Sequence, residues 1–319
     1  MYFTGIHHVS AITAQATNNL DFYRRILGLR LVKKTVNQDE PSMYHLFFGD
    51  ERGNPGTELT FFEIPRAGQT RRGNDSISLT SLRVATDAAL DYWQDRFTQL
   101  EVPHGTIKER AGRQTLSFED FEGQRLMLVS DEANVGVAGG VAWDGSDVPT
   151  EHGIIGLGPV KLTVFKIERT IQFMTQVLGF RQKGTYLSDE AGQPDIIVLE
   201  TGEGGSGAEI HLEHRTDLPQ ERPGRGSVHH VALRVNNEEE LNNWVDFLND
   251  KGISNSGYID RYYFRSVYLK DPNNITIELA TDGPGFDTDE ELAHLGESLA
   301  LPPFLEQHRA TIEANLQPL

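Results

Sequence analysis

The chain contains no cysteine. This absence excludes disulfide bonds, thiolate metal ligands and a cysteine nucleophile, so any bound metal must be held by nitrogen and oxygen atoms. No apolar run approaches the roughly 18 residues that span a bilayer. The N-terminal stretch MYFTGIHHVS also lacks the basic segment and apolar run of a secretory signal. We therefore expect a cytoplasmic protein with no membrane partner.

Positive charge is scarce, with 29 Lys and Arg residues against 47 Asp and Glu residues and a formal net charge of -18. Nucleic-acid binding draws on clustered Lys and Arg, so an excess of negative charge makes nucleic acid an unfavourable partner. Apolar residues make up 38% of the 319 positions and charged residues 24%. This composition is typical of an ordinary folded protein with about two domains.

A pattern of one strand, one helix and three strands occurs four times, in units of about 70 to 75 residues. The units start near residues 5, 77, 156 and 226, and LDFYRRILGLRLVKKT of the first is visibly akin to TIQFMTQVLGFRQKGT of the third. Residues 133–150 are rich in glycine and are interpreted as a linker. We therefore assign modules one and two to residues 1–132, modules three and four to 151–282, and a helical tail to 283–319.

Capping residues and helical spacing set the expected helix boundaries. The helix of the first module is expected to be capped by Asn18 or Asn19, and that of the second by Asp87. In the tail, DEELAHLGESLA and PFLEQHRATIEANL flank two prolines. These segments are expected to form two short helices that pack across the body.

Two histidine doublets stand in apolar strands near opposite ends of the chain, in GIHHVSAIT at 5–13 and GSVHHVALRV at 226–235. Neighbouring side chains of a strand point to opposite faces, so each doublet sends only one imidazole into a given cavity. His230 lies on the less apolar face of its strand, and His8 is close to its equivalent by position after the glycine. Only modules one and four carry doublets, so a shared site requires these modules to meet.

The last strand of the fourth module, ITIELAT at 275–281, offers a third ligand. Glu278 lies on the face opposite the apolar one, where an uncompensated carboxylate is costly to bury. Metal coordination would compensate it. His8, His230 and Glu278 form a 2-His-1-carboxylate set, which is associated with non-haem Fe(II) and O₂ chemistry. The competing interpretation is that these residues are packed, ion-paired or solvated without a metal.

Other histidines carry weaker signals. His45, in MYHLFF, could line a pocket. His211 and His214 alternate with glutamates in EIHLEHR and are interpreted as solvated or structural.

With these motifs the chain resembles the vicinal oxygen chelate superfamily and, within it, the ring-cleaving dioxygenases that act on hydroquinones. GIHHVS, VHHVAL and Glu278 match the iron-ligand positions of that family. The resemblance implies an α+β fold in which four βαβββ modules pair into two open mixed β-barrels, followed by a helical tail. It implies that modules one and four share the metal-bearing barrel, with Fe(II), or Mn(II) as an alternative, held by His8, His230 and Glu278.

The resemblance also places five further residues in the active site, with a serine where the family is expected to have threonine: His7, Ser10, His229, Arg261 and Tyr268. The implied substrates are a hydroquinone-type aromatic diol and O₂. Only one hydroxyl of a hydroquinone reaches the metal, so Arg261 and Tyr268 are expected to bind the other. His7 and His229 are expected to transfer protons near neutral pH. Association into a homo-oligomer is left open.

Three alternative functions fit the same modules. A catechol-cleaving extradiol dioxygenase would prefer catechol over hydroquinone. A glyoxalase-like isomerase usually has a further carboxylate from the partner module, and here TELTFFEI carries Glu58 and Glu63 only near its ends. A metal-free small-molecule-binding protein would need an aromatic groove and no iron.

Overall fold

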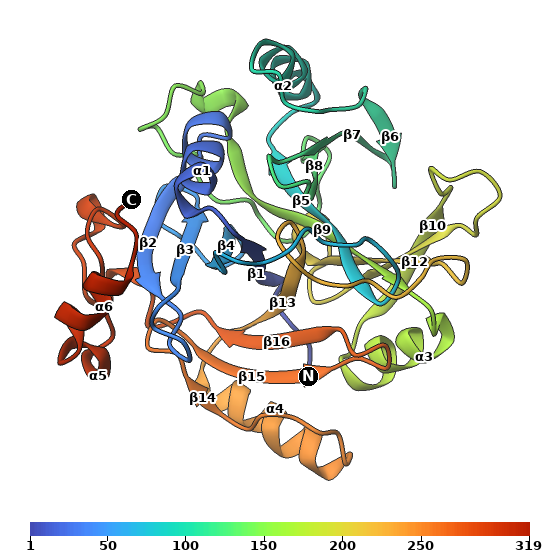
Figure 1. Cartoon of the computed structure of the whole chain (residues 1–319). Coiled ribbons are helices and arrows are strands. Elements are labelled where there is room, and N and C mark those ends of the chain that lie inside the picture. The colour runs from blue at the N-terminus through green and yellow to red at the C-terminus, as the bar shows by residue number, and fades with distance from the viewer.

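The computed structural model describes residues 1–319, and its strands form two eight-stranded mixed sheets (Figure 1). The first sheet combines strands from both ends of the chain: β1 (Ile6–Thr13), β2 (Arg30–Val36), β3 (Tyr44–Gly49), β4 (Glu58–Glu63), β13 (Val228–Val235), β14 (Ile259–Asp260), β15 (Arg265–Lys270) and β16 (Thr276–Thr281). Their order is β14-β15-β16-β13-β1-β4-β3-β2. At the centre β1 runs antiparallel to β13, while β4 and β16 flank this pair in parallel. The strands that carry the two histidine doublets are therefore neighbours.

The second sheet is built from the middle of the chain: β5 (Ser76–Val84), β6 (Lys108–Arg110), β7 (Arg113–Glu119), β8 (Arg125–Ser130), β9 (Ile154–Val164), β10 (Arg181–Tyr186), β11 (Ile196–Glu200) and β12 (Glu209–His214). Its order is β10-β11-β12-β9-β5-β8-β7-β6, with the same antiparallel centre and parallel flanks. A cluster of 52 buried apolar residues extends through both sheets, so they share one core. The two curled sheets of duplicated modules confirm the predicted fold class.

Each module contributes one helix. These are α1 (Ala16–Leu20), α2 (Asp87–Gln99), α3 (Ile167–Gln172) and α4 (Glu238–Asp250), and α1 and α3 continue into π-helical turns at Asp21–Ile26 and Phe173–Val177. Trp93 of α2 and Trp244 of α4 are buried in the core, as the helical spacing of the apolar residues predicts. None of the helices has the length and apolar character needed to cross a membrane.

Two helix caps differ from the prediction. The α1 helix begins at Ala16, whose backbone N–H donates to the Glu63 carboxylate of β4, so the cap comes from another element and Asn19 lies buried within the helix. The N-cap of α2 is Thr86, one residue before the predicted Asp87, and its hydroxyl accepts from the Ala89 N–H.

The tail is only partly helical. Its first α-helix, α5 (Pro303–Glu306), begins at the second of the two prolines, and α6 (Arg309–Asn315) follows it. The segment DEELAHLGESLA contains a single 3₁₀ turn at Leu292–His294. This segment lies along β2: buried Lys33 of β2 contacts the carboxylates of Asp289 and Glu290. A helix over the whole segment is therefore replaced by contacts to the sheet edge.

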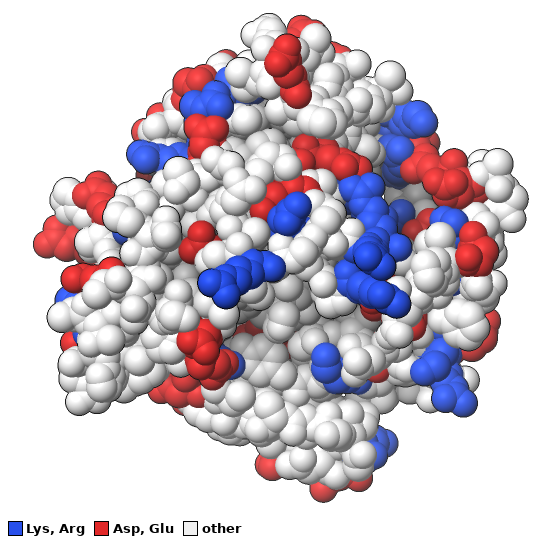
Figure 2. Space-filling view, viewed as in Figure 1, with Lys and Arg blue, Asp and Glu red and all other residues white.

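The segment 133–150, interpreted as a linker, contains no helix or strand up to residue 149, and a 3₁₀ turn begins at Thr150; it contacts both sheets. The Val141 N–H donates to Asp50, next to β3, and the Val137 N–H donates to the Gly204 carbonyl, between β11 and β12. On the face seen in Figure 2, Lys and Arg side chains gather near the middle of the molecule despite the net charge of -18. The acidic side chains are spread more widely.

Candidate metal centre and pocket

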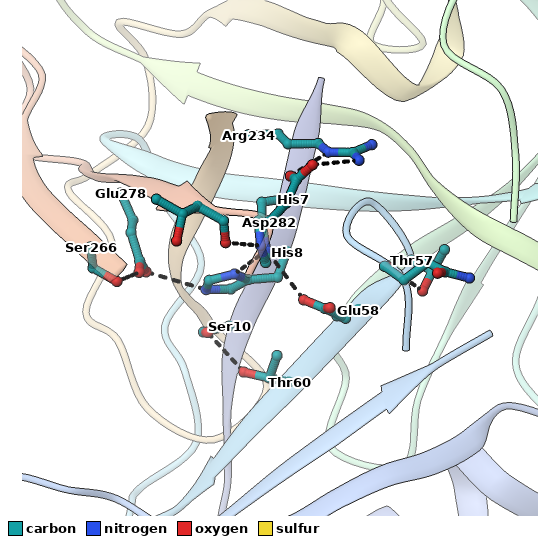
Figure 3. Close-up of polar contacts among 12 residues, drawn as sticks. His7, His8, Ser10, Thr57, Glu58, Thr60, Arg234, Ser266, Glu278 and Asp282 are labelled. Atoms are coloured by element: carbon teal, nitrogen blue, oxygen red, sulfur yellow. Dashed lines mark hydrogen bonds and ion pairs between the residues drawn. The ribbon is translucent and has the colours of Figure 1, made fainter. Parts of the chain in front are cut away.

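Three adjacent strands bring His8, His230 and Glu278 together inside the first sheet. The Nε2 atoms of the two histidines are 3.1 Å apart, and Oε2 of Glu278 lies 3.2 Å from Nε2 of His8 and 2.8 Å from Nε2 of His230. The three residues are 1%, 3% and 0% exposed, respectively. Figure 3 shows the Glu278 carboxylate directed toward the His8 ring. The set chosen from strand parity is thus assembled in a buried cluster.

The donor atoms fit a divalent metal. Ligands on one face of an octahedron, bound at about 2.1 Å, are separated by about 3.0 Å, and tetrahedral ligands by about 3.4 Å. The three observed separations cluster around the octahedral value. Oε1 of Glu278 accepts a hydrogen bond from the Ser266 hydroxyl, whereas Oε2 is buried without a hydrogen-bond partner. An unsatisfied oxygen that faces two imidazole nitrogens indicates a candidate metal site.

The electrostatics favour the protonation states that a metal requires. Burial alone would raise the pKa of Glu278, but the facing His8 and His230 rings hold it well below its usual value. Burial lowers the pKa of His8 to about 4, against the opposing effect of Glu278. At neutral pH the carboxylate is therefore ionised and the His8 imidazole is neutral, so both can donate electron pairs.

The first histidine of the N-terminal doublet supports the second. His7 Nε2 donates to the Thr281 carbonyl at 3.0 Å, and its Nδ1 lies 3.0 Å from Nδ1 of His8. In neutral His7 this leaves Nδ1 as an acceptor for the His8 Nδ1–H, and the Nε2 lone pair of His8 then faces Glu278. Neutral His7 in this tautomer therefore holds His8 in the tautomer that can bind a metal, whereas a protonated His7 would direct its Nδ1–H to Glu58.

Glu58 of β4 forms a second buried cluster with His7 and His8. Its Oε2 lies 3.2 Å from Nδ1 of His7, and Figure 3 shows Glu58 and Glu278 on opposite sides of β1. Burial would lower the pKa of His7, but Glu58 raises it above its usual value. The sequence suggests Glu58 only as an isomerase ligand, because strand parity gives no signal for its contact with His7.

The second doublet is built similarly, but its first histidine, His229, lies at the surface. Nδ1 of His229 is 2.7 Å from Nδ1 of His230. His229 is exposed and lines a separate surface depression with Ile12 and Lys270. Neither His7 nor His229 lines the pocket beside the three candidate ligands. Both first-position histidines therefore contact the candidate ligands and not the pocket interior.

Ser10, Arg261 and Tyr268 do line this pocket. Arg261 Nε donates to the Tyr268 hydroxyl at 3.3 Å, and its Nη1 pairs with Asp39 at 3.1 Å. Burial raises the pKa of Tyr268, Glu278 adds to this effect and Arg261 opposes it, so the phenol is neutral at physiological pH. A fixed guanidinium and a neutral hydroxyl thus lie side by side on one wall.

A polar chain and a set of aromatic rings complete the pocket. The Thr60 hydroxyl contacts Ser10 Oγ at 2.8 Å and Nε2 of His45 at 2.9 Å, and His45 lines the pocket as anticipated. Sequence reasoning did not single out the other lining residues, which include Gln38, Asp39, Phe47, Phe62, Tyr263 and Phe264. The enclosed volume is about 50 Å³. An aromatic ring needs more room, of the order of 150 Å³ for benzene, so the pocket must widen to admit one.

Module one has no counterpart of Glu278. In module four Glu278 pairs with Ala232, two residues after His230. In module one the residue two after His8 is Ser10, and it pairs with Thr60. A threonine therefore stands where a second carboxylate ligand would have to come from.

The architecture and the buried donor set define a class of protein. The family model "Glyoxalase/Bleomycin resistance protein/Dioxygenase superfamily" matches residues 5–128 and 156–279. The chain belongs to this superfamily.

Particular relatives are similar over nearly the whole chain. "Putative ring-cleaving dioxygenase MhqA" of Bacillus subtilis strain 168 is 54% identical over 321 residues, which cover 100% of both chains. "Chlorohydroquinone/hydroquinone 1,2-dioxygenase" of Sphingobium indicum is 29% identical over 95% of this chain and 92% of its own. A crystal structure titled "putative dioxygenase" from Bacillus subtilis superposes with a TM-score of 0.89 at 35% identity, covering 99% of this chain and 97% of the other.

Proposed function

We propose that the chain is an Fe(II)-dependent dioxygenase that cleaves the ring of a hydroquinone-type aromatic diol with O₂. The observation that carries the proposal is the buried face formed by His8, His230 and Glu278, with donor separations of 2.8 to 3.2 Å. The similarity to proteins named as a ring-cleaving dioxygenase and a hydroquinone 1,2-dioxygenase supports the reaction class.

His8, His230 and Glu278 would hold the iron, with Mn(II) as an alternative metal. When bound, the metal would supply adjacent positions for one substrate oxygen and for O₂, and a path for electrons between them. The Ser266 hydroxyl fixes one oxygen of Glu278 and so keeps the other directed at the histidines. His7 and His229, through their Nδ1 contacts, orient the two ligand rings.

Arg261 and Tyr268 suit the second hydroxyl of a hydroquinone. The two hydroxyls of this substrate are para, so the one away from the metal needs donors from the protein. Arg261 stays charged at any working pH, and the neutral Tyr268 phenol can donate or accept a proton in a hydrogen bond. The flanking rings of Phe62 and Phe264 offer apolar contact to the ring between the hydroxyls.

The isomerase alternative has less support, because Thr60 occupies the position from which module one would supply a second carboxylate. In a metal-free binding protein, Oε2 of Glu278 would stay buried without a hydrogen-bond partner. A catechol-cleaving enzyme shares the candidate ligands, and only a substrate comparison separates it from the proposal.

The test is O₂ uptake by protein loaded anaerobically with Fe(II), with hydroquinone, methylhydroquinone and catechol supplied in parallel. We expect uptake with the two hydroquinones, little with catechol, and none in protein without iron. A clear preference for catechol would replace the proposal by the catechol-cleaving alternative. Iron-loaded protein that consumes O₂ with none of the three diols would refute it.

A further inference from the structure

The second sheet contains a counterpart of the candidate metal centre. Gly5 precedes β1 with φ of 139°, and the corresponding glycine of module three, Gly156, lies within β9 with φ of 145°. Three residues after the glycine, His8 of β1 corresponds to Pro159 of β9. The first ligand position is therefore occupied by a side chain that cannot bind a metal.

Cross-strand pairing gives the second position. In the first sheet Ser10, five residues after the glycine, pairs with His230 of β13. In the second sheet Lys161, five residues after its glycine, pairs with Leu79 of β5. Leu79 thus stands in place of the second histidine, and a lysine stands in place of the serine.

The third position follows in the same way. In the first sheet Glu278 pairs with Ala232, two residues after the ligand histidine. In the second sheet Met127 of β8 pairs with Ser81, two residues after Leu79. None of the three counterpart side chains offers a nitrogen or oxygen ligand. The second sheet therefore has the same strand framework but no side chains at these positions that could hold a hard divalent metal.

A cavity nevertheless persists at this place. It is lined by Leu79, Met127 and Lys161 and has a volume of about 390 Å³, against about 50 Å³ beside the candidate metal centre. Small-molecule sites typically measure about 300 to 1,000 Å³. Phe118, Leu126 and Ile196 extend its apolar lining. The cavity is large enough for a small ligand and offers it apolar contact.

Most charged residues of the cavity wall are already paired within the protein. Arg110 binds Asp189 at 2.8 Å, and Lys161 binds Glu213 at 3.3 Å. Glu119 is held by Arg72 at 2.7 Å, outside the cavity lining. The two members of each pair neutralise each other, so these pairs add little net charge to the wall.

Arg125 is the exception. Its side chain is 33% exposed and makes no hydrogen bond within the protein, and its one ion pair, with Glu221, is 3.9 Å long. Guanidinium groups at binding sites usually satisfy several donors with carboxylate or phosphate oxygens. A guanidinium without hydrogen bonds beside an apolar cavity has its donors available to a ligand anion.

A buried network holds one further polar group at the cavity wall. The Tyr186 hydroxyl contacts Nδ1 of His211 at 3.1 Å, Nε2 of His211 contacts Glu209 at 3.1 Å, and Arg113 binds Glu209 at 2.8 Å. His211 is therefore buried and structural, one of the two roles anticipated for it. The network fixes the Tyr186 ring against the ligand space.

We propose that this cavity of the second sheet is a metal-independent binding site for a small organic anion with an apolar body, such as an aromatic or unsaturated carboxylate. The carboxylate pairs with Arg125, and the apolar body contacts Leu79 and Met127. The proposal stands apart from the dioxygenase activity, because no residue of the cavity belongs to the candidate metal centre.

The test is isothermal titration of the full chain, without added metal, with benzoate as the probe. Benzamide, which has the same shape and no charge, serves as the ligand control. We expect saturable benzoate binding and an affinity for benzamide that is at least about tenfold lower. Arg125→Gln should lower benzoate affinity by a similar factor. Leu79→Glu, at a partly exposed position, should also weaken benzoate about tenfold by placing a negative charge in the wall.

Two arginine variants locate the binding. Arg222→Gln removes an exposed arginine outside the cavity, and Arg261→Gln removes the guanidinium of the other pocket. Both should leave benzoate affinity unchanged. The proposal is overturned if binding is lost in Arg261→Gln, if it survives both Arg125→Gln and Leu79→Glu, or if benzoate shows no saturable binding up to about 10 mM. Circular dichroism of each variant verifies its folding.

Discussion

Replacing Glu278 by Gln tests the metal centre most directly. The substitution preserves side-chain volume and removes the negative charge that faces Nε2 of His8 at 3.2 Å and Nε2 of His230 at 2.8 Å. Glu278 is 0% exposed, so its charge interacts with the two imidazoles and a bound cation with little solvent screening. A bound divalent cation would be left with two neutral ligands in a buried site.

The expected size of the effect follows from this burial. Removing one partner of a buried charge pair costs about 3 to 5 kcal/mol, which corresponds to about 100- to 4,000-fold in affinity. We therefore expect the dissociation constant for Fe(II) to rise by at least about 100-fold. Folding of the metal-free variant should be preserved, because the amide keeps the side-chain volume and meets the His8 imidazole, whose pKa of about 4 leaves it neutral at pH 7.5.

The assay is anaerobic equilibrium dialysis against Fe(II), repeated with Mn(II). Glu213→Gln is the matched control, because Glu213 is a carboxylate of similar burial on β12, the last strand of module three. It should leave metal affinity unchanged. Metal affinity of Glu278→Gln within about threefold of the parent chain would refute the reasoning, as would an equal loss in Glu213→Gln.

Three further predictions concern the pocket wall, the tail and the response to pH. Tyr268→Phe should lower turnover of hydroquinone at least about tenfold and leave Fe(II) affinity unchanged, because the Tyr268 hydroxyl contacts Arg261 and not the candidate ligands. Steady-state O₂ uptake measures the turnover and dialysis measures the affinity, and a loss of about tenfold in Fe(II) affinity would contradict the prediction. Lys33→Met should lower the free energy of unfolding by about 3 kcal/mol and speed proteolysis of the tail, because Lys33 is buried against Asp289 and Glu290. An unchanged urea unfolding curve would contradict this prediction. The free energy of unfolding of the metal-free protein should fall by on the order of 3 kcal/mol between pH 6.5 and 4, because His8 has a pKa of about 4 in the folded chain and near 6.5 in the unfolded chain. Urea unfolding across this pH range should show the decrease, and His8→Gln should abolish most of it.

Strand parity predicted the buried cluster because it is a local property. Alternating side chains place Glu278 opposite the apolar face of β16, and the equivalence of positions after a glycine relates His8 to His230. The absence of doublets from modules two and three indicated which strands had to meet. Local periodicity and a long-range chemical requirement together were enough to locate the cluster.

Features that depend on tertiary contacts could not be predicted from the sequence. The pairing of β1 with β13 shifts register between Ile6 and Val9, and within this irregularity His7 meets Glu58. Gln38 and Asp39 reach the pocket from a loop whose path depends on packing and not on periodicity. The N-terminus of α1 is likewise satisfied by Glu63 from another strand. No local pattern marks such partners.

The central pairing of β1 with β13 also sets when the candidate metal centre can form during synthesis. His8 leaves the ribosome among the first residues, whereas Glu278 follows almost a full chain length later, about 15 to 50 seconds at ordinary translation rates. Until then the nascent polypeptide does not contain the complete set of candidate ligands. A prematurely terminated product that ends before β16 lacks the Glu278 carboxylate and therefore the complete set of candidate ligands.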